Sequence, residues 1–463
     1  MKHQQYDVVV IGGGASGVVA ALAAANNGAK TLIIDAGPIL GGELLSGLPI
    51  DSVYNARGER ILGGVAQELF DECKKMDGFI GPICDFRLLW YVCVDPEIMK
   101  IAVMKTLQRA RVVPLLYSTV QDVVVEDGTI KSVIVGHRNQ RTVISARQFV
   151  DCSGDGDVTA MAGGPFDISD ASGELQPLSL MFRMCGVDTQ PLLDLVCSHP
   201  ENFALGEIDA IRSGRTDAEL AEAMRKQGQP AIFLKREGPL LGEAIERGEM
   251  FPAPFIMTIP TSGPRREVCV NATRVAENID GTRADAVSGT LAKLMEQIEI
   301  CMGFLRRRVP GFENAVFAAV APRIGIRETR RIAGDCTLTE DDVLNARKSP
   351  NGVAKGSHHL DIHKPGARQL RIPVAQGGSY DIPIGCLTPK GLKNVHVAGR
   401  CLSATREAHA SVRVMGPCMG MGQAVGTAAA LSAHRGIADV RELPIQDLRA
   451  LLKQQGAVLD QTH

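Results

Sequence analysis

The chain opens with YDVVVI at residues 6–11, followed directly by GGGASG at residues 12–17. The apolar, β-branched run is typical of a parallel strand that is buried on both faces. The glycines have the spacing of a dinucleotide-binding turn: Gly12 permits the turn, Gly14 lets the backbone approach a pyrophosphate, and Gly17 lets the next helix pack closely on the strand. The phosphates would then lie at the amino end of that helix, where free N–H groups favour anions.

The residues that follow complete the same unit. An alanine-rich helix over 18–25 stops near Gly28, and a second strand over 31–34 ends in Asp35. An acid at this point is placed to bond a ribose diol, and it would repel the 2′-phosphate of NADP. An ordinary α/β sheet with a glycine-rich turn is the alternative, and the agreement of strand, turn, helix, strand and acid argues against it. The motif leaves the choice between NAD and FAD open.

Composition excludes several function classes. The 463 residues carry a net charge of −2 and only 4% aromatic residues, which argues against nucleic-acid binding. The 12 cysteines include no CxxC pair, so neither iron–sulfur clusters nor zinc sites are expected. Neither a secretory signal nor a membrane span is recognisable. We therefore expect a cytoplasmic enzyme, and the sequence leaves a homo-oligomer open.

The pattern of strands and helices predicts an α/β fold with three segments. Residues 1–165 form the first part of a nucleotide-binding domain, 166–320 form an α+β substrate or cap domain, and 321–463 return to the nucleotide-binding domain. Strands over 112–117, 120–125 and 130–135 are expected to form a β-meander, and Asp95 to cap a helix over 96–109. No second GxGxxG motif occurs in the middle segment.

Several later segments resemble one protein family. They are SGDGD at 153–157, RIGIRETRR at 323–331, DIH at 361–363 and AGRCLSAT at 398–405, which continues through EAHASVRVM at 407–415. They are similar to the FAD-dependent oxidoreductases related to fumarate reductase flavoproteins and heterodisulfide reductase A subunits. The resemblance implies FAD as the cofactor, held by a glutathione-reductase-like Rossmann domain into which a substrate domain is inserted. It implies that Asp155 bonds the ribityl chain.

Turn and resemblance together predict a set of cofactor-binding residues: Gly12, Gly14, Ala15, Ser16, Gly17, Asp35, Ala36, Gly41, Gly42, Glu43, Val120, Gly154, Asp155, Gly399, Arg400, Val414 and Met415. A helix over 418–434 with Pro417 at its first position would point its positive end at the flavin through the loop 412–416. Gly420, Gly422 and Gly426 on this helix would allow close packing against cofactor or sheet. A packing helix without cofactor contact is the alternative.

Three residues are predicted to be catalytic. His409, expected in a loop beside the flavin, would transfer a proton, although a structural role is equally compatible with the sequence. Arg413 and Arg327 would hold a carboxylate or polarise a carbonyl, or form an internal salt-bridged turn. His358, His359, Asp361 and His363 have no zinc-site spacing and are interpreted as a loop that lines the active site, so no metal is expected.

These features predict a flavin-dependent dehydrogenase or reductase that moves a hydride between a small organic substrate and flavin N5. A separate electron acceptor or donor is expected as partner, because no second nucleotide motif or cysteine cluster is found. Two alternatives stay open: an enzyme that uses FAD in a non-redox isomerisation or hydration, and a non-catalytic flavoprotein subunit of an electron-transfer complex.

Overall fold

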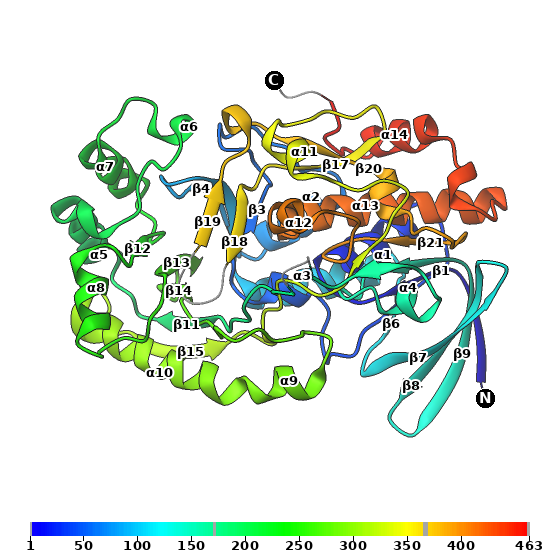
Figure 1. Ribbon diagram of the computed structural model, residues 1–463, viewed down its shortest axis with the longest axis horizontal. Helices are drawn as coiled ribbons and strands as arrows, with labels where there is room; N and C mark the ends of the chain where they lie inside the picture. Colours follow the sequence, from blue (N-terminus) through cyan, green and yellow to red (C-terminus); the bar gives the residue numbers. More distant parts are fainter. Residues whose placement is uncertain (1, 170–172, 364–368, 461–463) are drawn as a thin grey trace.

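The computed structural model describes residues 2–169, 173–363 and 369–460. Its largest sheet has a parallel part in which strand order runs β6-β2-β1-β9-β21 and an antiparallel hairpin, β7–β8, that joins the first half of β9 (Figure 1). The strands are β1 (Lys2–Ile11), β2 (Thr31–Ile34), β6 (Val113–Leu115), β7 (Ser118–Glu126), β8 (Thr129–His137), β9 (Gln140–Asp151) and β21 (Val395–Val397).

The predicted β-meander is correct only in part. β7, β8 and β9 are consecutive antiparallel neighbours, and the turn at Asp127 and Gly128 has φ angles of 49° and 74°, as a tight hairpin requires. The segment predicted over 112–117 does not join them. Its strand, β6, follows the helix over 96–109 and pairs in parallel with β2 at the other end of the sheet.

Two helices pack together against one face of this sheet. α1 (Ala15–Asn26) follows β1, and α13 (Met415–Arg435) lies along it. A Cβ atom at Gly422 would lie 2.3 Å from the carbonyl oxygen of Ser16, and one at Gly426 would lie 2.2 Å from that of Ala20. These glycines therefore bring α13 against α1, rather than against the sheet.

The remaining helices of this unit cover its surface and its connections. They are η1 (Gly42–Leu45), α2 (Val65–Lys74), α3 (Pro96–Arg109), α4 (Asp157–Met161), α11 (Glu340–Leu344), η3 (Ala375–Gly377), η4 (Ile384–Leu387), α12 (Arg406–Val412), η5 (Val440–Glu442) and α14 (Ile445–Gln454). Asp95 caps α3 as predicted, since its side chain accepts hydrogen bonds from the amides of Glu97 and Ile98.

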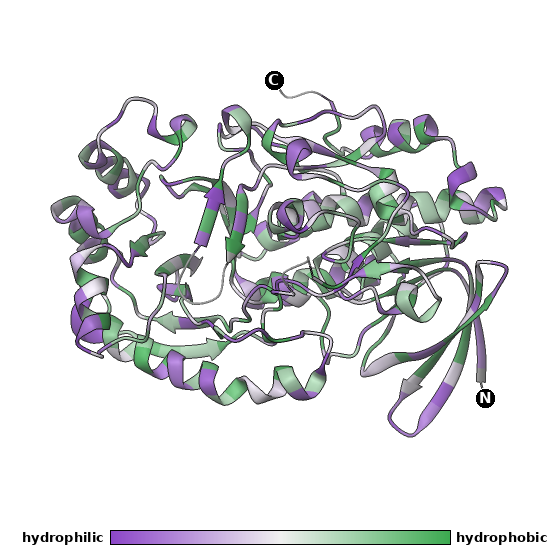
Figure 2. Cartoon of the chain, viewed as in Figure 1, coloured by the Kyte–Doolittle hydropathy of each residue, from purple (hydrophilic) through white to green (hydrophobic). Residues whose placement is uncertain are grey.

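A second unit is built on a five-stranded antiparallel sheet of order β12-β13-β14-β11-β15. Its strands are β11 (Phe182–Cys185), β12 (Phe233–Lys235), β13 (Phe255–Ser262), β14 (Glu267–Asn271) and β15 (Val316–Val320), and its helices are α5 (Thr189–Ser198), η2 (Pro200–Asn202), α6 (Asp209–Arg212), α7 (Asp217–Gln227), α8 (Pro239–Glu246), α9 (Ala284–Gly289) and α10 (Leu291–Arg308). Hydrophilic and hydrophobic residues alternate along α10 (Figure 2), whose buried face includes Leu294, Ile298, Cys301 and Phe304 at helical spacing.

The second unit takes in chain from outside residues 166–320. A three-stranded sheet of β3 (Ile50–Asp51), β4 (Phe79–Cys84) and β5 (Trp90–Val94) supplies Ile83, Tyr91 and Cys93 to the core of this unit. Three two-stranded sheets pair β10 (Phe166–Asp167) with β16 (Arg331–Ile332), β17 (Gly352–Gly356) with β20 (Tyr380–Pro383), and β18 (Leu360–His363) with β19 (Gln369–Ile372). An isolated bridge joins Ser179 and Gly325. None of the helices in the described ranges combines the length and the apolar character needed to cross a membrane.

Candidate functional site

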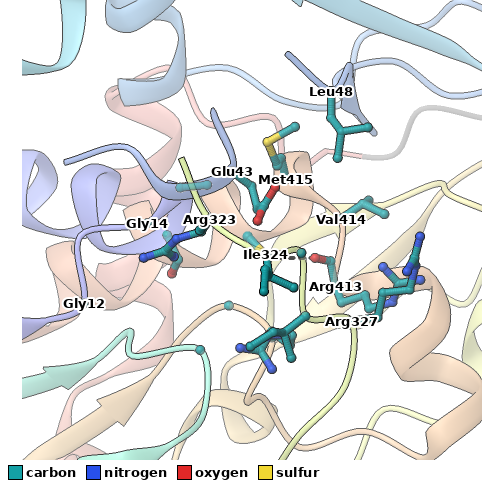
Figure 3. A pocket seen from close by; sticks show the side chains of 18 of the residues that line it. Gly12, Gly14, Glu43, Leu48, Arg323, Ile324, Arg327, Arg413, Val414 and Met415 are labelled. Carbon is teal, nitrogen blue, oxygen red and sulfur yellow. Dashed lines mark hydrogen bonds between the residues drawn. The ribbon is translucent and has the colours of Figure 1, made fainter. Parts of the chain in front are cut away.

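A cavity of about 690 Å³ extends from the glycine turn after β1 to the strands of the second unit. Figure 3 shows Gly12 and Gly14 on one side of it, Arg327 and Arg413 on the other, and Glu43, Ile324 and Met415 between them. Most of the predicted cofactor-binding residues line it: Gly12, Gly14, Ala15, Ser16, Asp35, Ala36, Glu43, Val120, Gly154, Asp155, Gly399, Arg400, Val414 and Met415.

The glycine turn has the geometry that the sequence predicts. Gly12 has a φ of 96°, and a Cβ atom there would lie 2.2 Å from the carbonyl oxygen of Cys152. Gly14 precedes the first residue of α1 without a side-chain cap, and a Cβ atom there would meet nothing within 4 Å. The turn is therefore open toward the cavity at the amino end of α1, where an anionic group is favoured.

Three predicted residues support this turn from behind instead of lining the cavity. A Cβ atom at Gly17 would lie 1.8 Å from the Gly12 carbonyl oxygen, so Gly17 serves the contact between helix and strand. The Gly41 amide donates a hydrogen bond of 2.7 Å to the Gly13 carbonyl, and a Cβ atom at Gly42 would lie 2.8 Å from Gly14 Cα. Their φ angles of 132° and 55° favour glycine at both positions.

Asp35 ends β2 beside the turn and is 8% exposed. Its two carboxylate oxygens accept hydrogen bonds of 2.6 Å from the amides of Gly13 and Gly37. These bonds fix the carboxylate where it lines the cavity, and each oxygen keeps a second lone pair. The acid is thus oriented as an acceptor for a hydroxyl pair next to the anion site.

Asp155 lies where β9 and β21 end together. Its Oδ1 atom accepts hydrogen bonds of 2.8 Å from both Thr329 Oγ1 and Arg400 Nη2, and Arg400 Nη1 donates to Thr329 Oγ1 at 2.6 Å. No hydrogen bond from the described residues reaches Oδ2. This second oxygen keeps its acceptor capacity. An anion site at Gly14 and carboxylate acceptors at Asp35 and Asp155, all lining one cavity, fit the pyrophosphate and hydroxyl groups of FAD.

The far wall of the FAD end is formed by the amino end of α13. This helix begins at Met415, two residues before the predicted Pro417. Proline is tolerated anywhere in the first turn of a helix, so Pro417 did not fix the exact start. Val414 and Met415 line the cavity, and a helix leaves its first amides without partners inside the helix. The positive end of α13 therefore faces the cavity, as the sequence predicts.

The predicted loop around His409 is a helix. Residues 406–412 form α12, capped by Thr405, whose hydroxyl accepts a hydrogen bond from the amide of Ala408. His409 is fully buried on α12, does not line the cavity, and has Nε2 2.7 Å from the carbonyl oxygen of Arg400. Burial lowers the pKa of His409 well below its usual value. This placement favours a role in positioning the 399–400 turn over direct proton transfer.

Arg327 and Arg413, the other two residues predicted to be catalytic, do line the cavity. Arg327 Nη1 donates to the carbonyl oxygen of Pro177 at 2.5 Å, and Arg413 Nη2 donates to Gln176 Oε1 at 3.2 Å. Burial lowers the pKa of both; for Arg327 the charge of Arg413 adds to the effect, and its pKa falls to about 9. These two partly exposed arginines place positive charge on this wall of the cavity, which favours an anionic ligand there.

Sequence reasoning missed Asp51, which ends β3 and lines the cavity close to α13. A Cβ atom at Gly416 would lie 2.1 Å from the Asp51 carbonyl oxygen, so strand and helix are in direct contact. Burial, and then the charges of Asp85 and Asp361, raise the pKa of Asp51 to about 8. Its Oδ1 atom is buried and accepts no hydrogen bond from the described residues.

His358 stands next to Asp51. Its Nε2 atom lies 3.6 Å from Asp51 Oδ2, and its Nδ1 atom lies 2.8 Å from the carbonyl oxygen of His359. A carbonyl only accepts, so Nδ1 carries the proton and Nε2 keeps a lone pair toward Asp51. Burial lowers the pKa of His358 to about 4. A protonated carboxyl group and a neutral imidazole therefore face each other at neutral pH.

Of the four residues interpreted as a loop that lines the active site, His358, His359 and Asp361 line the cavity. They form part of β18 and of the turn before it, and the side chain of His363 lies outside the described part of the chain. Ser411 of α12 donates a hydrogen bond to the His358 carbonyl oxygen, which ties the segment to α12. The described residues contain no group of three or more His, Cys, Asp or Glu side chains that could hold a metal ion.

Comparisons with known proteins agree with this site. The family model described as FAD dependent oxidoreductase matches residues 7–452. None of the curated proteins matches the chain.

Solved structures with a similar arrangement are distant in sequence. They include a geranylgeranyl bacteriochlorophyll reductase-like protein from Thermoplasma acidophilum (13% identity, 98% of this chain and 85% of that one, TM-score 0.47), the flavin-dependent brominase Bmp2 (12%, 96% and 83%, 0.48) and the p-nitrophenol 4-monooxygenase PnpA from Pseudomonas putida (10%, 99% and 87%, 0.45). With TM-scores below 0.5, these similarities carry no information about the reaction of this chain. The family match over nearly the whole chain, on a cavity whose residues fit FAD, shows that the protein is an enzyme of the FAD-dependent oxidoreductase family with FAD as its cofactor.

Proposed function

We propose that this enzyme is a dehydrogenase or reductase that transfers a hydride between a small organic substrate and flavin N5. The observation that carries the proposal is the single cavity that joins the nucleotide-binding residues to a polar end at Asp51, His358, Arg327 and Arg413. When bound, FAD supplies a group that accepts or gives a hydride. The positive end of α13 favours negative charge in the neighbouring part of the cavity.

The framework around the cofactor supports a finer classification. The order of the parallel strands, the glycine turn after β1 and the return of the chain at β21 fit a glutathione-reductase-like FAD domain. The antiparallel sheet of the second unit and the strands β3–β5 form the cap that closes the cavity, in agreement with an inserted substrate domain. We assign the substrate to the part of the cavity between these two units.

Asp51 and His358 are proposed as the proton-transfer pair, in place of His409. Protonated Asp51 can give its proton to a substrate that is being reduced, and ionised Asp51 can accept one from a substrate that is being oxidised, while the neutral imidazole of His358 faces the carboxyl group. Arg327 and Arg413 would orient the substrate through the charge-assisted hydrogen bonds of their guanidinium groups. A separate electron acceptor or donor would complete the cycle.

The test is anaerobic reduction of the purified, yellow protein. Small organic metabolites are screened for one that bleaches the visible flavin absorbance. Asp51→Asn is then compared with Asp167→Asn, which changes an exposed aspartate on β10 outside the cavity. We expect Asp51→Asn to slow flavin reduction by about 10²-fold or more with unchanged FAD content, and Asp167→Asn to match the wild type.

Two results would contradict the proposal. Turnover during which the flavin stays oxidised would assign FAD to a non-redox step. A protein that reduces and oxidises no metabolite, yet forms a stable complex with an electron-transfer protein, would be a subunit of that complex. Normal reduction rates in Asp51→Asn would remove Asp51 from proton transfer while leaving hydride transfer in place.

A further inference from the structure

The outer end of the cavity contains a buried arginine whose position is fixed by a turn between β4 and β5. Asp85 Oδ1 accepts hydrogen bonds from the amides of Arg87, Leu88 and Leu89 at 2.8, 2.8 and 2.9 Å. Arg87 is 5% exposed and lines the cavity. Its guanidinium carbon lies 3.8 Å from the centre of the Phe233 ring, so the cation lies over an aromatic face.

The hydrogen-bonding capacity of Arg87 is largely unused. The Nε and Nη1 atoms are buried and have no hydrogen-bond partner in the described part of the chain. The nearest carboxylate oxygen, Asp85 Oδ2, lies 3.7 Å from Nε, beyond hydrogen-bond distance. His359, 4% exposed on the same wall, has a buried Nδ1 atom that is also without a partner. Buried charged donors are costly without acceptors, so an acceptor is expected here when the site is in use.

Electrostatics at this end favour an anion as that acceptor. One carboxylate, Asp361, interacts with four arginines of the region: Arg274, Arg327, Arg371 and Arg413. Arg87 adds a fifth positive charge, which lowers the pKa of Arg371 after the effect of burial. Asp51, with a pKa raised to about 8 by burial, contributes no charge at neutral pH. Asp85 lies 3.7 Å from Arg87 and Glu207 lies 3.6 Å from Arg371, so these five arginines face three carboxylates, Asp85, Glu207 and Asp361.

The neighbouring wall is apolar. Phe233 and Phe255 stack with their ring centres 4.4 Å apart, and Phe255, Met257 and Leu89 line the cavity beside Arg87. An occupant of this end therefore meets a cation on one side and aromatic and thioether groups on the other. Only a molecule with both an anionic and an apolar part satisfies both.

We propose that the substrate is an organic acid whose carboxylate binds Arg87 and His359, while its apolar body lies along Phe255 and Met257 toward Asp51. The assignment of this ligand as substrate rests on the proposed function; the anion site itself rests on Arg87. This proposal places the anionic group of the substrate at Arg87, apart from the arginine pair Arg327 and Arg413.

The test uses benzoate and its uncharged analogue benzamide as probes, titrated by calorimetry into the FAD-loaded protein. Three variants are compared: Arg87→Met, Arg87→Lys and the control Arg138→Met. Arg138 lies over the Tyr117 ring at 5.4 Å, is exposed and lies outside the cavity, so its loss changes the net charge equally. We expect benzoate to bind at least about tenfold more tightly than benzamide, and Arg87→Met to abolish the difference.

The control should bind both probes as the wild type does. Arg87→Lys should retain part of the preference, because lysine keeps the charge but loses the planar fork. Equal binding of benzoate and benzamide by the wild type, or an undiminished preference in Arg87→Met, would overturn the proposal. If Arg87→Met fails to retain FAD, Arg87→Lys decides, and unchanged benzoate affinity in that variant would overturn it.

Binding is measured without turnover, which separates this inference from the proposed reaction. Benzoate binding that depends on Arg87, in a protein whose flavin no metabolite reduces, would keep the anion site and remove the proposed function. Flavin reduction by neutral metabolites alone, without benzoate binding, would keep the proposed function and remove the anion site.

Discussion

The contact between α1 and α13 gives a sharp prediction for Gly422→Ala. The new Cβ atom would lie 2.3 Å from the carbonyl oxygen of Ser16, whereas ordinary contact begins at 3.4 Å. The atom that it meets belongs to the backbone, so the helices have to separate by about 1 Å. Overpacking of this kind costs about 1–3 kcal/mol, and replacing a helical glycine by alanine returns about 1 kcal/mol. We expect a net loss of up to about 2 kcal/mol in the free energy of unfolding.

The displacement has a second consequence at the cofactor. Ser16 lines the FAD end of the cavity, so its movement alters the turn that receives the pyrophosphate. Weaker FAD binding is therefore expected together with lower stability. Each 1.4 kcal/mol lost from the free energy of FAD binding raises the Kd about tenfold. Urea unfolding followed by circular dichroism measures stability, and titration of the apoprotein with FAD measures affinity.

Gly420→Ala is the matched control on the same helix. Its new Cβ atom would lie 3.2 Å from Ala354 Cβ, a side-chain atom, so a small adjustment is enough. This variant should be neutral or more stable by up to about 1 kcal/mol and should bind FAD normally. If Gly422→Ala unfolds and binds FAD as Gly420→Ala does, the close packing of α1 on α13 is not what shapes the cofactor site.

Three further predictions concern protonation and positioning. In stopped-flow pH profiles, the rate of flavin reduction by substrate should rise as pH increases through about 8, because Asp51 then loses its proton and can accept one. The rate of substrate reduction should fall over the same range. A wild-type profile without this step would contradict the role of Asp51. His409→Phe, which removes the contact with the Arg400 carbonyl, should lower FAD content and flavin reduction together, whereas loss of reduction at full FAD content would restore His409 as a proton-transfer residue. Burial would raise the pKa of Glu267, but hydrogen bonds and the charge of Arg183 lower it to about 2. About 3 kcal/mol of the free energy of unfolding should therefore be lost as pH falls from above 4.5 through 2. In Glu267→Gln, the free energy of unfolding should depend less on pH over this range.

Local sequence was enough to predict the nucleotide end of the site. The β1–α1–β2 unit depends on contacts between residues close in the chain, and its glycines and Asp35 have the predicted geometry. Each of these elements carries its own pattern of apolar residues and turn signals, which is why they could be read one at a time.

The substrate end could not be predicted in the same way. The raised pKa of Asp51 comes from burial and from Asp85 and Asp361, which are distant in sequence. His409 was wrongly placed in a loop because α12 is a short helix of small and polar residues, whose apolar pattern is too short to detect. Arg87 gains its importance from Phe233, which belongs to another segment of the chain. Such properties arise only when the fold brings these segments together.

The most direct test of the central claim is a crystal structure of the enzyme with FAD bound. We expect the pyrophosphate at the Gly13–Ser16 turn, the ribose at Asp35, and the isoalloxazine beside Val414 and Met415, with Asp51 and His358 on the open side of the cavity. An isoalloxazine that lies away from Val414 and Met415, or FAD bound outside this cavity, would contradict the assignment of the site and of the reaction proposed for it.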